Sequence, residues 1–447
     1  MNIECIPDSL VVLIELLRAR LRSADFLNRH RRQSRDFTRK RCLTFPVVML
    51  LILQKSVKSI QRHLHEFLAG LAEGTDWEPV TAGAWTQARA KLRASAFTEL
   101  NTQCVLPLVY GPERSGERQD WHGHRLLGLD SSLVRLPGHP QLAQAFRVVE
   151  VHNQHGAVGL RYCEGRMSVL YDLLNHVGLD GRLVSGSQGE VSLAEEQLAH
   201  LQPGDVTLTD CGYTGYRFLA RVRQHQAHFV ARCSRGSFAA AQELFRSNRA
   251  GRSVVTRLWA PADQKLELRK LGLPLDMTVR FVSVRLPDGQ LEVLVTSLLS
   301  EELYPTAEFL DLYHRRWGHE TYHLFFKSRL DLENWSGETL EAVEQDFAAT
   351  LLMANLESVL TRPATAALAQ RSSGPRQHIN HAVSYHAIKD QVLDLLHGQR
   401  PAAEVIGHLQ RLFLGSPVSV RAQHKKRKKR SWGRSYYFQR CKRKIVF

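Results

Sequence analysis

The first 110 residues carry apolar side chains at intervals of three and four, the spacing of one face of a helix. This pattern predicts four helices, at 10–21, 45–57, 60–71 and 84–100. Basic residues are dense between them, as at 29–32 and 39–41. We therefore expect a helical N-terminal region with a positively charged surface.

The pattern becomes extended after residue 120. Strands are predicted at 125–136, 167–174, 181–184, 204–210 and 228–232, with helices at 193–201 and 218–226. Strands that come first in series and then alternate with helices indicate a mixed α/β sheet covered by helices. Two acids are notable in this apolar background, because Asp130 lies inside the first strand and Asp210 ends the fourth.

Residues 235–300 show few helical periods. Short apolar runs predict strands at 254–258, 266–271, 279–286 and 291–298, and the Pro-Asp-Gly sequence at 287–289 predicts a hairpin turn. Pro305 then opens a long helical stretch to about residue 329. Further helices are predicted through residue 360 and again at 385–414.

The composition is that of a globular protein with excess positive charge. The 447 residues are 43% hydrophobic and 23% charged, which excludes disorder, collagen and coiled coil. The net charge of +16 favours a polyanionic partner, most often nucleic acid, although an anionic membrane surface or a general basic bias would also explain it. Residues 421–447 favour nucleic acid, because they hold a basic run with aromatic residues and no acid.

No feature of the sequence indicates a membrane or secretion. No stretch approaches the ~18 apolar residues that span a bilayer, and the first residues lack the basic segment of a secretory signal. The seven cysteines stand far apart without a Cys-x2-Cys pair, which predicts reduced, mostly buried thiols. We expect a soluble intracellular protein without a membrane partner.

The segment that begins at Thr81 resembles the second helix of a helix-turn-helix. A turn of small residues precedes a helix with four polar or basic positions, Gln87, Arg89, Lys91 and Arg93. Such a helix contacts DNA when these side chains are exposed. An ordinary basic surface helix fits the same pattern.

The helix predicted after Pro305 carries an unusual row of functional groups. The row consists of Tyr313, Arg316, Glu320 and Lys327. On one helix these four side chains point within roughly 60° of one another around the helix axis. An apolar stripe runs beside it, formed by Leu310, Trp317 and Leu324. Charges beside the inward edge fit a site where a carboxylate binds a cation while arginine and lysine hold phosphates. A surface ladder of ion pairs is the alternative.

A second pattern overlaps this row. His319-Glu320-Thr-Tyr-His323 matches the His-Glu-x2-His signature of zinc metalloproteases, whose histidines share a helix face while the glutamate acts as base. A third ligand would come from downstream, where the candidates are Glu338, Glu341 and Glu344. The protease hypothesis leaves Asp130, Asp210 and the positive charge unexplained.

The remaining acids favour different chemistry. A carboxylate in an apolar strand is unfavourable unless it is paired or bound to a metal, and α/β sheets place ligands at strand ends. Asp130, Asp210 and Glu320 together would hold two magnesium ions roughly 4 Å apart, which suits in-line displacement at a phosphodiester. Hard oxygen ligands favour Mg²⁺ or Mn²⁺ over Zn²⁺. Acids that cap a following helix are the structural alternative.

Three acid-bearing motifs resemble those of bacterial DDE transposases of insertion-sequence family four. They are Gly-Leu-Asp130-Ser-Ser, Thr-Asp210-Cys-Gly-Tyr and Tyr313-x2-Arg316-x3-Glu320-x6-Lys327. The β-rich segment between the second and third acids, the run at 36–45 and Asn-Trp-Ser-Gly-Glu-Thr at 334–339 are also similar to that family. The likeness covers about residues 20–360.

The resemblance implies a ribonuclease H-like core in which Asp130, Asp210 and Glu320 bind two Mg²⁺ ions, with Mn²⁺ as a substitute. Arg316 and Lys327 would contact DNA phosphates, and Tyr313 would help to position them. Family members excise the element from donor DNA, often through a hairpin intermediate, and join it to target DNA. A tryptophan of the insertion domain commonly holds a flipped base, and Trp259 is the one tryptophan of that segment.

The resulting expectation is an α/β fold in five parts. A helical DNA-binding domain at 1–110 precedes the core at 120–234, a β-rich insertion at 235–300, the rest of the core at 301–365 and a helical C-terminal region with its basic tail at 366–447. The expected partners are transposon inverted-repeat ends, target DNA and a second copy of the chain in a synaptic dimer. We expect a cytoplasmic, nucleoid-associated bacterial protein. A non-catalytic DNA-binding relative is the alternative.

Overall fold

The computed structural model describes residues 7–39, 41–56, 58–72, 79–111, 118–152, 158–328, 330–371 and 376–419. They belong to two compact units. The helical unit comprises Met1–Ser115, Arg135–Cys163 and Phe326–Phe447, and the sheet unit comprises Gly116–Val134 and Glu164–Phe325. The basic run predicted to bind nucleic acid, at 421–447, lies outside the described residues. Within the described ranges, every helix is too short or too polar to cross a membrane.

The helical unit confirms the predicted helical N-terminal region. Its N-terminal helices are α1 (Asp8–Arg22), α2 (Ala24–His30), α3 (Phe45–Gln54), α4 (Ile60–Leu71), α5 (Ala82–Arg89), α6 (Ser95–Leu100) and α7 (Leu106–Tyr110). Its later elements are α8 (Pro140–Ala145), β3 (Arg147–His152), α15 (Leu340–Ala369), β11 (Gln377–His378), α16 (His381–Asp390), α17 (Ala402–Gly415) and β12 (Val418–Ser419). The helix predicted at 84–100 is therefore two helices.

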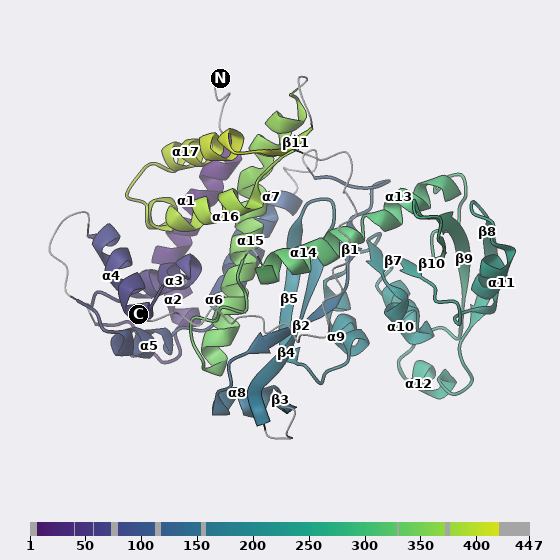
Figure 1. Ribbon diagram of the computed structural model, residues 1–447, viewed down its shortest axis with the longest axis horizontal. Coiled ribbons are helices and arrows are strands. Elements are labelled where there is room, and N and C mark those ends of the chain that lie inside the picture. The colour runs from purple at the N-terminus through teal and green to yellow at the C-terminus, as the bar shows by residue number, and fades with distance from the viewer. Residues whose placement is uncertain are drawn as a thin grey trace. The chain divides into compact units, whose positions relative to one another are not determined.

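The core of the helical unit forms around α15. This 30-residue helix packs against α3, α6, α16 and α17, and Figure 1 shows it as the long green helix among them. Eight of the ten residues of α3 are buried, which explains why its sequence is apolar on all sides rather than on one face. Burial of these apolar side chains is the main stabilising contribution in this unit.

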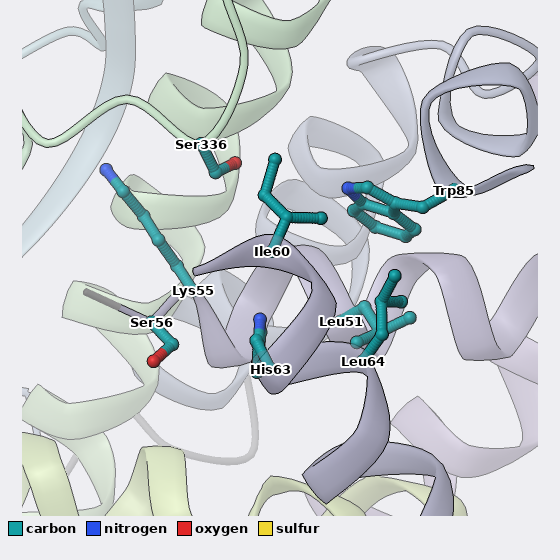
Figure 2. Close-up of a pocket in the computed structure, with 8 residues that line it drawn as sticks. All are labelled: Leu51, Lys55, Ser56, Ile60, His63, Leu64, Trp85 and Ser336. Carbon is teal, nitrogen blue, oxygen red and sulfur yellow. The ribbon is translucent and has the colours of Figure 1, made fainter. Parts of the chain in front are cut away.

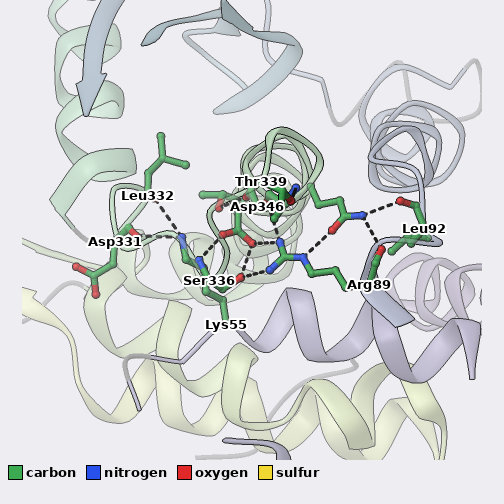
Figure 3. Close-up of polar contacts among 11 residues, drawn as sticks. Lys55, Arg89, Leu92, Asp331, Leu332, Ser336, Thr339 and Asp346 are labelled. Carbon is green, nitrogen blue, oxygen red and sulfur yellow. Dashed lines mark hydrogen bonds and ion pairs between the residues drawn. The ribbon is translucent and has the colours of Figure 1, made fainter. Parts of the chain in front are cut away.

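Arg89 corrects the helix-turn-helix interpretation. It is 4% exposed, and its guanidinium pairs with Asp346 on α15 at 2.6 Å (Figure 3). The same group donates to Gln345 Oε1 at 2.7 Å and to Ser336 Oγ at 2.6 Å. Arg89 is thus a structural residue that ties α5 to α15. Of the other three predicted contacts, Gln87 and Arg93 are exposed and Lys91 is half-buried.

A small cavity lies beside this network, between α3, α4 and α5. Figure 2 shows its lining, formed by Leu51, Lys55, Ser56, Ile60, His63, Leu64, Trp85 and Ser336. Its volume is about 20 Å³, which is room for about one water molecule and not for a nucleotide or cofactor.

The sheet unit contains most of the strands. Its elements are β1 (Leu126–Gly128), β5 (Val177–Ser185), α9 (Glu190–Gln197), β6 (Val206–Thr209), α10 (Tyr216–Gln224), β7 (His228–Arg232), α11 (Ala239–Ser247), β8 (Ser253–Trp259), α12 (Lys265–Lys270), β9 (Asp276–Arg285), β10 (Leu291–Thr296) and α13 (Phe309–His314). The unit boundaries fall within β2 (Ser131–Leu136), β4 (Val158–Asp172) and α14 (Trp317–Ser328).

These strands form the predicted mixed sheet. Its order through the sheet unit is β5-β4-β1-β6-β7-β10-β9-β8, and β2 and β3 also pair with β4. Strands β1, β6 and β7 are parallel, whereas β5, β4, β10, β9 and β8 pair antiparallel to their neighbours. Because β10 pairs with β7, the strands of the β-rich segment 235–300 continue the central sheet.

One prediction within 235–300 is wrong. Residues 266–271 were expected to be extended, but 265–270 form α12, which buries Leu268 and leaves Leu266 66% exposed. Alternating leucines over six residues do not distinguish a strand from a short helix, and here the turn from Pro261 to Gln264 starts a helix. The segment also contains α11, an alanine-rich helix that ends at Asn248 in the left-handed conformation (φ 49°).

Candidate active site

Asp130 lies in a break between two strands. The predicted strand at 125–136 is β1 and β2 in the structure, and Asp130 stands in the gap between them, half-buried. Its Oδ1 accepts a hydrogen bond from the Ser131 N–H at 2.8 Å. Burial, reinforced by the nearby charge of Asp210, raises the pKa of Asp130 to about 6 against the opposing effects of Ser131 and Arg316.

Asp210 occupies the equivalent position on the neighbouring strand. Strands β1 and β6 are parallel, with Gly128 opposite Leu208, so Asp130 and Asp210 each follow two residues after that pair. The carboxyl ends of parallel strands meet at one edge of a sheet, which brings the two acids together. Asp210 Oδ1 accepts from the Gly212 N–H at 2.8 Å, which holds its carboxylate at the start of the next turn.

Glu320 is connected to these acids through Arg316. Arg316 Nη2 donates to Glu320 Oε1 at 2.8 Å, and Arg316 as a whole is 5% exposed. The charge of Arg316 also acts on Asp130 and is itself influenced by Asp210. A single buried cation is therefore within electrostatic reach of all three predicted acids.

The structure corrects the single helix that was predicted after Pro305. It forms α13 and α14, separated at Arg315 and Arg316, because i to i−3 hydrogen bonds from Arg316 and Gly318 tighten the chain there. Tyr313 is 2% exposed, and the Arg316 guanidinium lies 5.4 Å from its ring centroid. Tyr313 and Arg316 thus remain neighbours despite the break.

The apolar stripe predicted on this segment does not face the core. Trp317 is 46% exposed and Leu324 is 64% exposed, whereas Arg316, His319 and His323 are buried. The tightened turn changes the helical phase, so that Tyr313 and Arg316 lie inward, whereas the Glu320 side chain is 41% exposed. Tyr313 and Arg316 are therefore more deeply enclosed than a surface ion-pair ladder would be.

His319 is a fully buried polar side chain of α14. It is 0% exposed, and its Nε2 lies 2.9 Å from the carbonyl oxygen of Val169 on β4. Burial lowers the pKa of His319 to about 4. One ligand atom from each of Asp130, His319 and His323 lies within 4.8 Å of the other two, and this is the only such group of His, Cys, Asp and Glu found in the part of the chain that the structure describes. Asp210 and Glu320 are not part of that group.

The matches to known proteins fall on this site. The family model described as "Transposase DDE domain" matches residues 121–356, a range that contains Asp130, Asp210 and Glu320. The chain belongs to this family.

A curated relative supports the family assignment. Transposase InsG for insertion sequence element IS4, from Escherichia coli (strain K12), is 27% identical over 285 residues, which are 62% of this chain and 60% of that protein. The chain thus spans three fifths of the length of this transposase relative. A solved structure, described as the cryo-EM structure of piggyBac transposase synaptic complex with hairpin DNA, has a TM-score of 0.41 and 10% identity over 93% of this chain and 88% of that one.

Lys327 completes the predicted motif within the transposase DDE domain match. It lies on α14, two turns after Glu320, and is half-buried in the helical unit. Burial lowers its pKa, and the charge of Glu333 opposes this shift.

The sequence analysis did not single out one positively charged side chain, Arg232, at the strand ends of the transposase DDE domain. Arg232 is the last residue of β7 and comes directly after Ala231, which pairs with Thr209 of β6, so Arg232 is in register with Asp210 at the same edge of the sheet. It bonds to Glu292 at 3.2 Å and lies 3.8 Å from Cys211 Sγ. An arginine at the end of the predicted strand 228–232 was the available signal, because neighbouring parallel strands end at the same edge.

Gly128 allows the transposase DDE domain to pack α14 against β1. A Cβ added there would meet the His319 ring at 3.1 Å, and that ring is buried and held by the Val169 carbonyl. Gly128→Ala is expected to lower the free energy of unfolding by about 1–3 kcal/mol, because the ring has little room to move. Gly236→Ala, where no atom lies within 4 Å of the new Cβ, is the matched control and should change stability by less than about 0.5 kcal/mol. Urea unfolding measures both, and equal stabilities for the two variants would contradict this packing.

Proposed function

We propose that this chain is a DNA transposase that excises an insertion sequence at its inverted repeats and transfers the element's strands into target DNA. The observation that carries the proposal is the matched position of Asp130 and Asp210, each of which stands two residues after the Gly128–Leu208 pair of adjacent parallel strands. Arg316 joins them electrostatically to Glu320. The match to the transposase DDE domain across all three acids supports the same reaction class.

A ribonuclease H-like core is part of this proposal. Its support is the strand order β5-β4-β1-β6-β7, in which three antiparallel strands are followed by two that run parallel to β1. We also propose that the helical region 1–110 binds DNA. After the exclusion of Arg89, its exposed basic residues include Arg32, Arg35, Arg39, Arg41 and Arg93.

We propose Asp130, Asp210 and Glu320 as ligands of two Mg²⁺ ions, which Mn²⁺ can replace. The donor set fits, because it consists of carboxylate oxygens and because Asp130 has a raised pKa that a nearby divalent cation would lower again. Bound there, the ions supply activation of an attacking oxygen and stabilisation of a leaving oxygen. Arg316 orients Glu320 through their ion pair, and the Gly212 N–H orients Asp210.

The protein groups proposed to hold the DNA phosphates are Arg316, Lys327 and Tyr313. Arg316 Nε is buried and has no hydrogen-bond partner among the described residues, so one of its donors remains for a phosphate oxygen. The Tyr313 ring lies beside the guanidinium and restricts its orientation. Trp259 is proposed as the residue that holds a flipped base, since it is 61% exposed at the end of β8 with Arg257 against its ring.

The proposed partners are double-stranded transposon ends, target DNA and a second copy of the chain in the synaptic complex. The net charge of +16 supports a polyanionic partner. We propose a cytoplasmic, nucleoid-associated location for the same reason.

The test is an excision assay with a supercoiled plasmid that carries the inverted repeats flanking the coding region. The proposal predicts release of the element by the full chain in Mg²⁺ or Mn²⁺ and no release after chelation. Absence of metal-dependent cleavage together with specific binding to the same ends would contradict catalysis and support a non-catalytic DNA-binding protein.

A further inference from the structure

Asp130 has two close neighbours that the proposed reaction does not use. His319 and His323 are one turn apart on α14, and a ligand atom of each lies within 4.8 Å of the other and of the Asp130 carboxylate. The imidazoles are 0% and 6% exposed, and their ring centroids are 4.4 Å apart. Two buried imidazoles and a carboxylate thus converge on one point of the sheet unit.

The hydrogen bond of His319 determines which of its nitrogens is available. A carbonyl oxygen only accepts, so the 2.9 Å contact with Val169 places the proton on Nε2. His319 Nδ1 then carries the lone pair. It is buried and has no hydrogen-bond partner among the described residues. A histidine that donates one ring nitrogen to a backbone carbonyl while the other faces a polar cluster has the arrangement of a metal ligand.

The position of the His319 ring is fixed before any ligand binds. Its Cβ and ring carbons lie where a side chain at position 128 would stand, so Gly128 leaves the space that the ring fills. Tyr171 and Tyr322, with ring centroids 3.9 Å apart, pack beside it. A site whose ligands are held in this way loses little conformational entropy when an ion binds.

The donor types select the class of ion. Imidazole nitrogen binds Zn²⁺ and neighbouring transition metals well, whereas Mg²⁺ prefers oxygen ligands and retains several waters. Two histidines at i and i+4 with one carboxylate form a frequent three-ligand zinc set that leaves a fourth position open. Zn²⁺ is therefore the ion that this group fits best.

We propose that Asp130, His319 and His323 form a binding site for a zinc-class divalent ion. The third ligand comes from the break between β1 and β2, not from the downstream glutamates that a metalloprotease would use. Glu320, the base in a metalloprotease, is instead paired with Arg316. The site shares Asp130 with the proposed magnesium centre, so Zn²⁺ bound there suppresses DNA cleavage; this consequence rests on the proposed function.

The binding test uses the full chain, freed of metal and without DNA or Mg²⁺. Zinc is added and the excess is removed. Elemental analysis then gives the number of zinc ions retained per chain, and a thermal unfolding experiment gives the midpoint temperature with and without zinc. We expect His323→Gln and Asp130→Asn to retain one equivalent less than the parent chain and to lose a zinc-dependent rise in midpoint. His314→Gln, an exposed histidine of α13, is the matched control and should behave as the parent.

Equal zinc retention by the parent chain and His323→Gln would overturn the site. If circular dichroism without metal shows that His323→Gln does not fold, the test is the visible absorption spectrum of the parent chain loaded with Co²⁺. Visible ligand-field bands of a tetrahedral nitrogen and oxygen site support the proposal, and their absence contradicts it. Asp210→Asn should retain zinc like the parent, because Asp210 is outside the group. A parent chain that retains zinc but does not excise the element would count against the proposed function alone. A parent chain that excises the element but retains no zinc at this site would count against this site alone.

Discussion

Asp210→Asn is expected to reduce excision of the element by about a thousandfold or more, which is on the order of 4 kcal/mol of transition-state stabilisation. The substitution keeps the volume of the side chain and the oxygen that accepts from the Gly212 N–H. It removes the negative charge that lies beside Asp130. The local turn should survive while the capacity to hold divalent cations is lost.

The measurement is single-turnover cleavage of a labelled transposon end, run beside a gel-shift assay with the same DNA. Affinity for DNA should change little, because the loss lies in chemistry. Asp263→Asn is the matched control, since Asp263 is an exposed aspartate of the sheet unit. A variant at Asp210 that cleaves within tenfold of the parent chain would remove this residue from the catalytic set.

Arg89→Ala is expected to lower the free energy of unfolding of the helical unit by about 3–5 kcal/mol. The change leaves Asp346, which is 0% exposed, without its cation. Although burial alone raises the pKa of Asp346, Arg89, Lys55 and Ser336 together hold it below its usual value. Lys55 adds to this network by donating to the carbonyl oxygens of Asp331 and Leu332 (Figure 3).

Urea unfolding followed by circular dichroism measures this loss. Arg93→Ala, at an exposed arginine four residues later, should change stability by less than about 0.5 kcal/mol. The double variant Arg89→Met with Asp346→Leu should recover most of the stability, because neither buried charge is then left alone. If Arg89→Ala unfolds like the parent and instead loses DNA affinity, the helix-turn-helix interpretation of this residue would stand.

The sequence was sufficient to locate the elements that carry the candidate site. The strands that end at Asp210 and at Arg232 were predicted within a few residues, because buried parallel strands are short apolar runs bounded by turns. The pairing of β1 with β6 was not predictable from either strand, since register depends on contacts distant in sequence. The resemblance to a known family supplied the expectation that the three acids converge, which local pattern could not.

The errors have a common cause, which is that tertiary packing decides what periodicity leaves open. Arg89 has the spacing of a surface residue, and only the position of Asp346, more than 250 residues away, makes it a core residue. The row from Tyr313 to Lys327 was placed on one ideal helix, but tightened turns at Arg316 changed its phase. His319 matched a zinc signature, yet the carboxylate grouped with it belongs to Asp130, in the break between β1 and β2, rather than to a downstream glutamate.

The most direct test of the central claim is anomalous diffraction from crystals of the chain bound to transposon-end DNA and soaked in Mn²⁺. The account predicts manganese peaks within ~2.2 Å of carboxylate oxygens of Asp130, Asp210 and Glu320, beside the scissile phosphate. Peaks bound only by Asp130 and the histidines of α14, with Glu320 still paired to Arg316 and remote from the metal, would contradict it.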